Sequence, residues 1–167
     1  MSETLASRLD RPVDERRDHV LGPPSAQITL VEYGSYACPH CRAANERIAE
    51  VRDELGDRLR YVFRHRPLTG SAIARRAAEL IERARTPEQF WKAHVALMTR
   101  SPELTEDDLV TVAREYDLGE PDPGARSRVD ADEKSSRASG VAFTPTFFIN
   151  GTRYDGPWDE SSFAGAM

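Results

Sequence analysis

The sequence lacks several features that would point to particular classes of protein. It contains no apolar run near the roughly 18 residues that a membrane-spanning helix needs, and its net charge of −5 provides no excess of positive charge for a phosphate backbone. Residues 1–20 carry Asp, Glu and Arg where a signal peptide needs an apolar centre. We therefore expect no membrane insertion, no nucleic-acid partner and, for the chain as written, a cytoplasmic location; a processed form would be periplasmic or otherwise extracytoplasmic.

Cysteine is also scarce, since Cys38 and Cys41 are the only two in 167 residues. A pair so close together cannot staple distant parts of a fold, and a reducing cytosol leaves such pairs to catalysis or metal binding. The remaining composition, 39% hydrophobic and 31% charged, is typical of a globular protein, and the length suits one domain. The motif Cys38-Pro39-His40-Cys41 is therefore the main functional signal.

The residues around Cys38 predict the start of a helix. Proline is favoured at the first position inside a helix, which makes Pro39 that residue and Cys38 the N-cap. An N-cap side chain accepts hydrogen bonds from the N–H groups of the next turn and lies at the positive end of the helix dipole, so Cys38 should ionise readily. His40 either supports this thiolate or is an exposed bystander.

Cys41 is predicted to face the core. It begins an apolar stripe along one side of the helix, whose members are Cys41, Ala44, Ile48, Val51 and Leu55. Side chains at i and i+3 lie roughly 5–6 Å apart, within the reach of a disulfide. The pair therefore suits an attacking Cys38 and a sheltered, resolving Cys41.

Two other roles for the cysteine pair are weaker. A structural disulfide across so short a loop would remove little entropy from the unfolded chain. A zinc site would need a second closely spaced pair of ligands, whereas His19, His65 and His94 are scattered along the chain. We therefore expect no metal and no organic cofactor.

Strand patterns lie on both sides of the motif. Residues 1–25 are polar and contain proline, which indicates a surface arm, and the near-continuous apolar run from 26 to 33 predicts a central strand. Glu32 interrupts this run, so it either reaches solvent or is buried near the dithiol, where it would relay a proton. Gly56 ends the helix and residues 59–64 alternate as a second strand, which places the dithiol at the carboxyl edge of a parallel pair.

Residues from about 69 to 139 predict a helical insertion. Thr86-Pro87-Glu88-Gln89 combines an N-cap, a proline at N1 and a capping-box glutamine, and Thr105 opens a further helix that Gly119 breaks. A last, poorly apolar helix is expected from about 123 to 139. Three large side chains in this block are interpreted as packing residues: Phe90, Trp91 and His94.

The stretch from Val141 to Tyr154 predicts a return to strand. Asn150-Gly151 within it indicates a two-residue type I′ hairpin, so the last two strands should be antiparallel. Thr144-Pro145 precedes the two strands, and a proline at the start of a sheet strand removes an N–H donor from the hydrogen bonds between strands. A cis bond would account for this proline and leave the Thr144 backbone free to pair with an extended peptide.

In this order the elements resemble the DsbA-like branch of the thioredoxin-fold thiol:disulfide oxidoreductases over about residues 11–163. Within that branch the chain is most similar to thioredoxin-like domains, some of which occur attached to sodium/proton antiporters. The expected fold class is α/β, a thioredoxin fold in residues 26–167 with a helical insertion between the second and third core strands. The likeness is carried by the Cys-Pro-His-Cys motif and by the runs Arg11–Asp14, Asp18–Val20, Leu30–Gly34, Tyr61–His65 and Thr144–Gly151.

The resemblance implies roles for individual residues. Cys38 attacks and Cys41 resolves the mixed disulfide, while the Thr144–Pro145 bond is cis and faces the dithiol. Glu32 corresponds to a buried acid that assists proton transfer to the second cysteine. Pro39-His40 is the middle pair found in the oxidising members of the family.

Phe143 departs from the family pattern, which usually has a small residue two positions before the proline. We expect this side chain to make the approach to the substrate groove beside Thr144 and Pro145 narrower or more apolar. The groove itself would hold an extended peptide.

We predict a thiol:disulfide oxidoreductase that exchanges disulfides with protein, peptide or small-thiol partners through a mixed disulfide at Cys38. Two alternatives remain open: a redox-inert module that binds peptides beside Pro145, and a glutathione-dependent isomerase or transferase of the same superfamily, although those generally lack the second cysteine. The direction of exchange depends on the reduction potential of the pair. The sequence leaves that direction and the oligomeric state open.

Overall fold

The computed structural model describes residues 7–100, 103–158 and 160–167. These residues form a five-stranded sheet with the strand order β1-β3-β2-β4-β5. The strands are β1 (His19–Leu21), β2 (Ile28–Gly34), β3 (Leu59–His65), β4 (Thr146–Ile149) and β5 (Thr152–Tyr154). The helices are α1 (Pro39–Leu55), α2 (Ala72–Ile81), α3 (Pro87–Thr99), α4 (Glu106–Glu115), α5 (Ala125–Ala138) and α6 (Glu160–Ala166), with a short 3₁₀ turn at Gly56–Arg58.

Helix α1 connects β2 to β3, which are parallel neighbours in the centre of the sheet. Strand β4 pairs with β2 and β5 pairs with β4, both antiparallel. Asn150 and Gly151 have φ values of 50° and 84°, as the predicted hairpin turn requires. The predicted thioredoxin fold, with its helical insertion, is confirmed.

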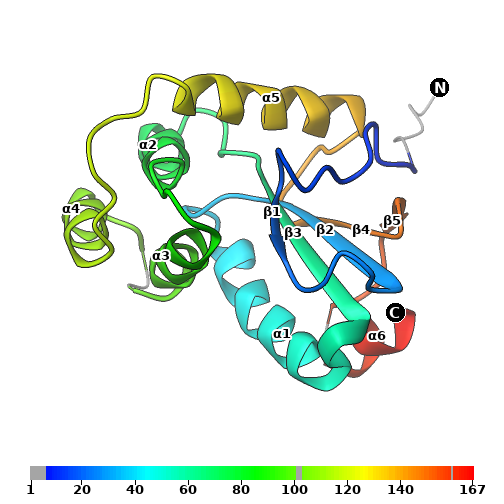
Figure 1. Cartoon of the computed structure of the whole chain (residues 1–167). Coiled ribbons are helices and arrows are strands. Elements are labelled where there is room, and N and C mark those ends of the chain that lie inside the picture. The colour runs from blue at the N-terminus through cyan, green and yellow to red at the C-terminus, as the bar shows by residue number, and fades with distance from the viewer. Residues whose placement is uncertain (1–6, 101–102, 159) are drawn as a thin grey trace.

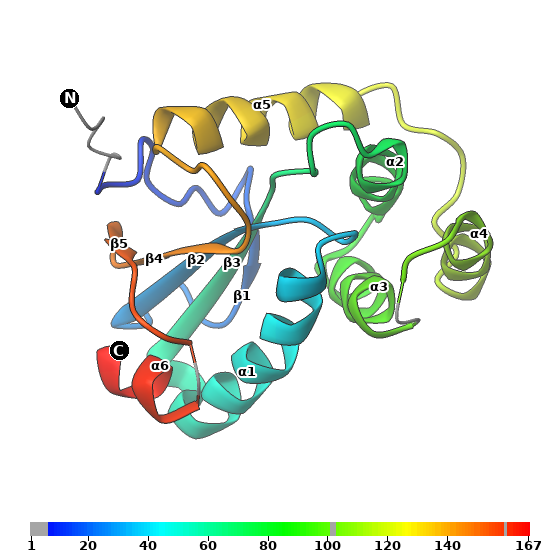
Figure 2. The ribbon, with the colours of Figure 1, turned by 180° about the vertical axis from the view of Figure 1, so that it is seen from behind.

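Helices cover the two faces of the sheet and one of its ends. Figure 1 shows α1 and α6 against one face and α5 across the other, while α2, α3 and α4 lie together beside the carboxyl ends of β2 and β3. The view from behind in Figure 2 shows the same arrangement. Because side chains alternate along a strand, Leu30 and Glu32 of β2 face α1, whereas Val31 and Tyr33 face α5.

Strand β1 was not predicted from the sequence. It lies within the polar arm of residues 1–25 and pairs antiparallel with β3, with His19 opposite Phe63. Three residues are too few for a recognisable period-two pattern. The strand is recognised only from its pairing with the free edge of β3 in the structure. The arm is thus tied to the sheet at two places, through β1 and through an isolated bridge between Arg8 and Thr152 of β5.

Two local predictions were wrong. Thr86 does cap α3, but the Gln89 amide oxygen accepts from the N–H of Arg85 rather than from that of Thr86, and the reciprocal capping box forms instead at α4, between Thr105 and Asp108. Residues 141–145 are also not strand, because β4 begins only at Thr146. Pro145, which has no N–H to donate, ends the irregular segment before β4.

None of the helices in the described ranges has the length and apolar character that a membrane-spanning segment requires.

Candidate active site

The first turn of α1 holds the two cysteines. Cys38 is the N-cap, with extended backbone angles (φ −85°, ψ 118°), and Pro39 follows it at the first helical position. The Cys38 sulfur accepts a hydrogen bond from the Cys41 N–H, with an N···S distance of 3.3 Å. The predicted cap is confirmed, and its side chain is a thiol where most helices have a hydroxyl or a carboxylate.

The environment of Cys38 favours its thiolate. A hydrogen bond from the Cys41 thiol is the main cause that lowers the Cys38 pKa from 9.0 to about 5, helped by Thr144 and by the N–H groups of Cys41 and His40. Burial opposes this shift but is outweighed. At neutral pH the Cys38 sulfur is therefore largely ionised and nucleophilic.

Cys41 has the opposite character. Its side chain is buried, and burial together with its hydrogen bond to Cys38 and the nearby Glu32 raises its pKa well above the ordinary range. The Ser35 N–H donates to the Cys41 sulfur at 3.4 Å and holds it in place. Both residues have little exposed surface, 3% for Cys38 and 1% for Cys41, so the asymmetry of the pair lies in charge: Cys38 is ionised and Cys41 is protonated.

Glu32 is buried beneath α1, with 1% of its surface exposed, which decides between the two positions that the sequence left open. The Tyr61 hydroxyl donates to Glu32 Oε1 at 2.5 Å, whereas Oε2 has no hydrogen-bond partner among the described residues. Burial is the main cause that raises the Glu32 pKa to about 8; the Cys38 charge adds to it and the bond from Tyr61 opposes it. A carboxyl group with this pKa can gain or lose a proton near neutral pH.

The loop before β4 faces the first turn of α1. The Thr144–Pro145 peptide bond is cis, as the resemblance implied, and the Thr144 carbonyl oxygen lies 3.5 Å from the Cys38 sulfur. Pro145 is buried, while Phe143 is 60% exposed. The side chains of Pro39 and His40, which follow Cys38 in the sequence, are exposed at the same end of α1.

Two residues of this region were not identified from the sequence, namely Ser35 and Tyr61. Ser35 acts through its backbone N–H, which any residue type offers, so no side-chain pattern announces it. Tyr61 faces α1 because it pairs with Leu30 in the parallel register, two positions before Glu32 on the same face. That proximity becomes visible only when the register of β2 and β3 is known.

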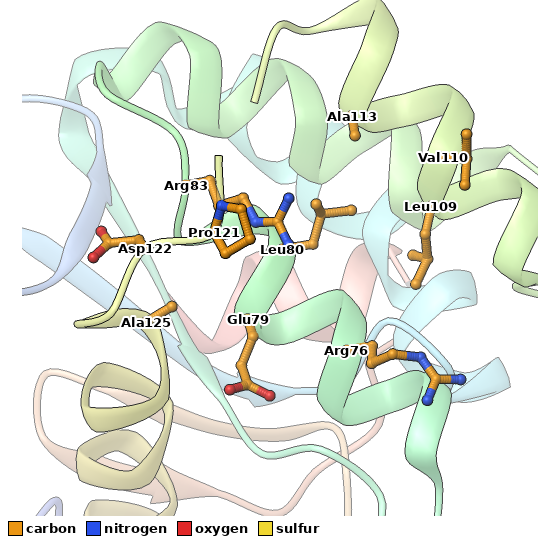
Figure 3. A pocket seen from close by; sticks show the side chains of 10 residues that line it. All are labelled: Arg76, Glu79, Leu80, Arg83, Leu109, Val110, Ala113, Pro121, Asp122 and Ala125. Atoms are coloured by element: carbon orange, nitrogen blue, oxygen red, sulfur yellow. The ribbon is translucent and has the colours of Figure 1, made fainter. Parts of the chain in front are cut away.

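A separate cavity of about 400 Å³ lies among the helices of the insertion, away from the dithiol. Figure 3 shows side chains of α2 and α4 facing one another across it, with Pro121 and Asp122 at one side. The residues predicted from the sequence as candidate site residues do not line it. We therefore assign the chemistry to the end of α1 and not to this cavity.

A sheet with a dithiol at the first turn of a helix and a cis-proline loop opposite it defines a thioredoxin-like protein. The chain belongs to a thioredoxin family whose model matches residues 14–167. It is 57% identical to part of the Na(+)/H(+) antiporter NhaA of Nitrosospira multiformis; the match includes 99% of this chain but only 28% of that protein.

Solved structures show the same fold. A thioredoxin-like oxidoreductase from Silicibacter pomeroyi is 25% identical with a TM-score of 0.78, over 91% of both chains. BdbD from Bacillus subtilis, in its oxidised form, is 22% identical with a TM-score of 0.77, over 99% of this chain and 96% of that one. The chain thus shares the fold of a thioredoxin-like oxidoreductase, and it spans about a quarter of the antiporter that it matches.

Proposed function

We propose that this chain is a thiol:disulfide oxidoreductase that acts on protein or peptide cysteines through a mixed disulfide at Cys38. The observation that carries the proposal is the position of the Cys38 sulfur. It is hydrogen bonded at the N-terminus of α1, with its pKa lowered to about 5, and it lies 3.5 Å from the Thr144 carbonyl oxygen. Neither a structural disulfide nor a passive binding groove needs an ionised sulfur at this place.

The reaction has two exchanges. In the reducing direction the Cys38 thiolate attacks one sulfur of a substrate disulfide, and the other substrate sulfur leaves as a thiolate. Cys41 then loses its proton and attacks the Cys38 sulfur, which expels the second substrate thiolate. The substrate gains two electrons, and the enzyme is left with a Cys38–Cys41 disulfide; the oxidising direction is the same sequence reversed.

Glu32 is proposed as the group that accepts the Cys41 proton. The Cys38 charge is one cause of the raised Glu32 pKa, and the mixed disulfide removes that charge. Capture of a substrate therefore lowers the Glu32 pKa and increases the fraction of carboxylate available to accept the proton. Proton transfer becomes easier at the step that needs it.

The decisive experiment compares wild type with Cys41→Ser. Wild type should reduce insulin disulfides with dithiothreitol as the electron donor. Reduced Cys41→Ser, from which dithiothreitol has been removed before insulin is added, should accumulate a mixed disulfide with insulin, because the resolving sulfur is missing. Non-reducing electrophoresis and mass spectrometry would detect the adduct and place it at Cys38.

Cys38→Ser is the matched control and should neither turn over nor form an adduct. A redox-inert binding module would show no turnover in wild type and no adduct in Cys41→Ser. Dependence of turnover on glutathione, with transfer of glutathione to a second substrate, would instead identify a transferase. Either result would contradict the proposal.

Glu32→Gln should slow the resolution of a preformed mixed disulfide. General-base assistance typically accelerates a reaction by about 10²–10⁴-fold, so we expect the resolution rate at pH 7 to fall at least about 10-fold. Thermal stability should be retained or rise, because a buried carboxyl group has been removed. Stopped-flow release of a chromophoric thiol would measure the rate. Glu46→Gln, at an exposed position of α1, is the control; an equal effect of both substitutions would remove Glu32 from the mechanism.

A further inference from the structure

Two histidines and a glutamate meet at the carboxyl end of β3. His19 of β1 pairs with Phe63 of β3, so the two side chains lie on the same face, and His65, two residues further along β3, also faces that side. Glu82 approaches from the end of α2. The residues come from positions 19, 65 and 82, which the fold brings together.

Their polar atoms converge on one point. Glu82 Oε2 lies 2.5 Å from His19 Nε2 and 3.1 Å from His65 Nε2, and the three atoms lie within 4.8 Å of one another. Two ligand atoms on a tetrahedral zinc ion lie about 3.3 Å apart, since each is about 2.0–2.1 Å from the metal. Small side-chain movements would therefore make room for an ion between these three atoms.

The surroundings hold Glu82 and His19 in place, whereas the buried Nδ1 of His65 has no hydrogen-bond partner among the described residues. Arg128 Nε donates to Glu82 Oε1 at 2.8 Å, which leaves Oε2 directed at the imidazoles. The Phe90 ring stacks on His19 with a centroid distance of 3.6 Å and an interplanar angle of 7°. Supporting contacts of this kind orient metal ligands in proteins.

The cluster is closed on its inner side and open on its outer side. The side chains of His65 and Glu82 are 1% and 3% exposed, whereas that of His19 is 27% exposed. His19 and Glu82 also line two adjoining cavities of about 400 and about 290 Å³. An ion can enter past His19, and a water molecule can occupy a fourth coordination position.

We propose that His19, His65 and Glu82 form a binding site for one divalent transition-metal ion, with Zn²⁺ as the best match. Two imidazole nitrogens and one carboxylate oxygen suit zinc, whereas calcium and magnesium prefer a set of oxygens. Each imidazole coordinates through Nε2 and keeps a proton on Nδ1, so protonation of the imidazoles competes with the ion and binding weakens at acidic pH. It joins the sheet to α2 and thereby to the helical insertion.

The test uses untagged protein in which Cys38 and Cys41 have been oxidised to the disulfide, because free thiols would also bind zinc. Calorimetry should show one Zn²⁺ bound per chain and a higher melting temperature in its presence. Co²⁺ should give the visible absorption of a four-coordinate nitrogen and oxygen site without a thiolate charge-transfer band.

His19→Ala is the primary variant, because its side chain is partly exposed and the fold can be verified by circular dichroism. We expect His19→Ala and Glu82→Gln each to weaken Zn²⁺ binding at least about 100-fold. Loss of a residue that only supports a ligand already weakens metal binding by about 10–100-fold, and these two residues are the proposed ligands themselves. His40→Ala, an exposed histidine outside the cluster, should bind as wild type does. Absence of saturable binding in wild type, or unchanged binding in His19→Ala, would overturn the proposal.

Discussion

The rate of Cys38 alkylation should reach half of its plateau near pH 5. The thiolate is the reactive form, and the Cys38 pKa is lowered from 9.0 to about 5 by the hydrogen bond from the Cys41 thiol and by the N–H groups at the start of α1. Cys41, which is buried and has a raised pKa, should remain unmodified over this range. Iodoacetamide labelling from pH 3 to 9, with mass spectrometry to locate the label, provides the measurement.

Replacing Cys41 separates the two causes of this shift. Cys41→Ser keeps a donor beside Cys38, so the midpoint should remain well below 9, whereas Cys41→Ala removes the donor and should raise the midpoint relative to the serine variant. The N–H groups of α1 are present in both. A wild-type midpoint near the ordinary value of a thiol would show that the helix end does not ionise Cys38 and would undermine the proposed attack.

The same pKa affects the stability of the reduced protein. The Cys38 pKa is lower in the folded protein than in the unfolded chain, so the Cys38 thiolate stabilises the folded state. This stabilisation is complete above the ordinary thiol pKa and is lost as the pH falls through about 5. The disulfide form has no thiolate and closes only a short loop, so it gains little in return. The Cys38–Cys41 pair should therefore be more stable as a dithiol than as a disulfide, and its disulfide form should oxidise the thiols of a partner.

Arg64→Met should destabilise the fold by about 3–5 kcal/mol, because it removes the nearer arginine from the buried Asp18 carboxylate and leaves only Arg11, at 3.6 Å, as a cationic partner. Arg64 of β3 is fully buried, and its guanidinium makes two hydrogen bonds to Asp18 of the N-terminal arm, at 2.9 and 3.0 Å. A third bond, at 2.8 Å, reaches the Tyr33 hydroxyl. Chemical denaturation monitored by circular dichroism would measure the change.

Arg60→Met is a matched control on the same strand. Arg60 also pairs with a carboxylate of the arm, that of Glu15, but the side chains are 18% and 42% exposed, so solvent screens the pair and we expect a loss of at most about 1 kcal/mol. Asp18→Asn combined with Arg64→Met should recover part of the stability, because no buried charge remains without a partner. Equal losses for the two single arginine variants would show that the burial of Arg64 has no special consequence.

The placement of the two cysteines was predictable because it comes from local chemistry. Proline at N1, a capping cysteine before it and a second cysteine one turn later place both sulfurs at the start of α1. The pKa values of the pair also depend on burial and on Thr144 and Glu32, which lie outside this turn. The βαβ unit and the hairpin at Asn150-Gly151 follow likewise from short-range periodicity and turn preferences.

Contacts between distant segments were not predictable in the same way. Strand β1, the bond from Tyr61 to Glu32 and the buried pair of Asp18 with Arg64 depend on register and on which strand edge is free. His19 and His65 appear scattered in the sequence and converge only when β1 pairs with β3. The sequence by itself determined the fold class and the position of Cys38 as the N-cap of α1, because both arise from local preferences. Only the tertiary structure decided the burial of Glu32 and the histidine cluster, because pairing between distant residues has no signal in local pattern.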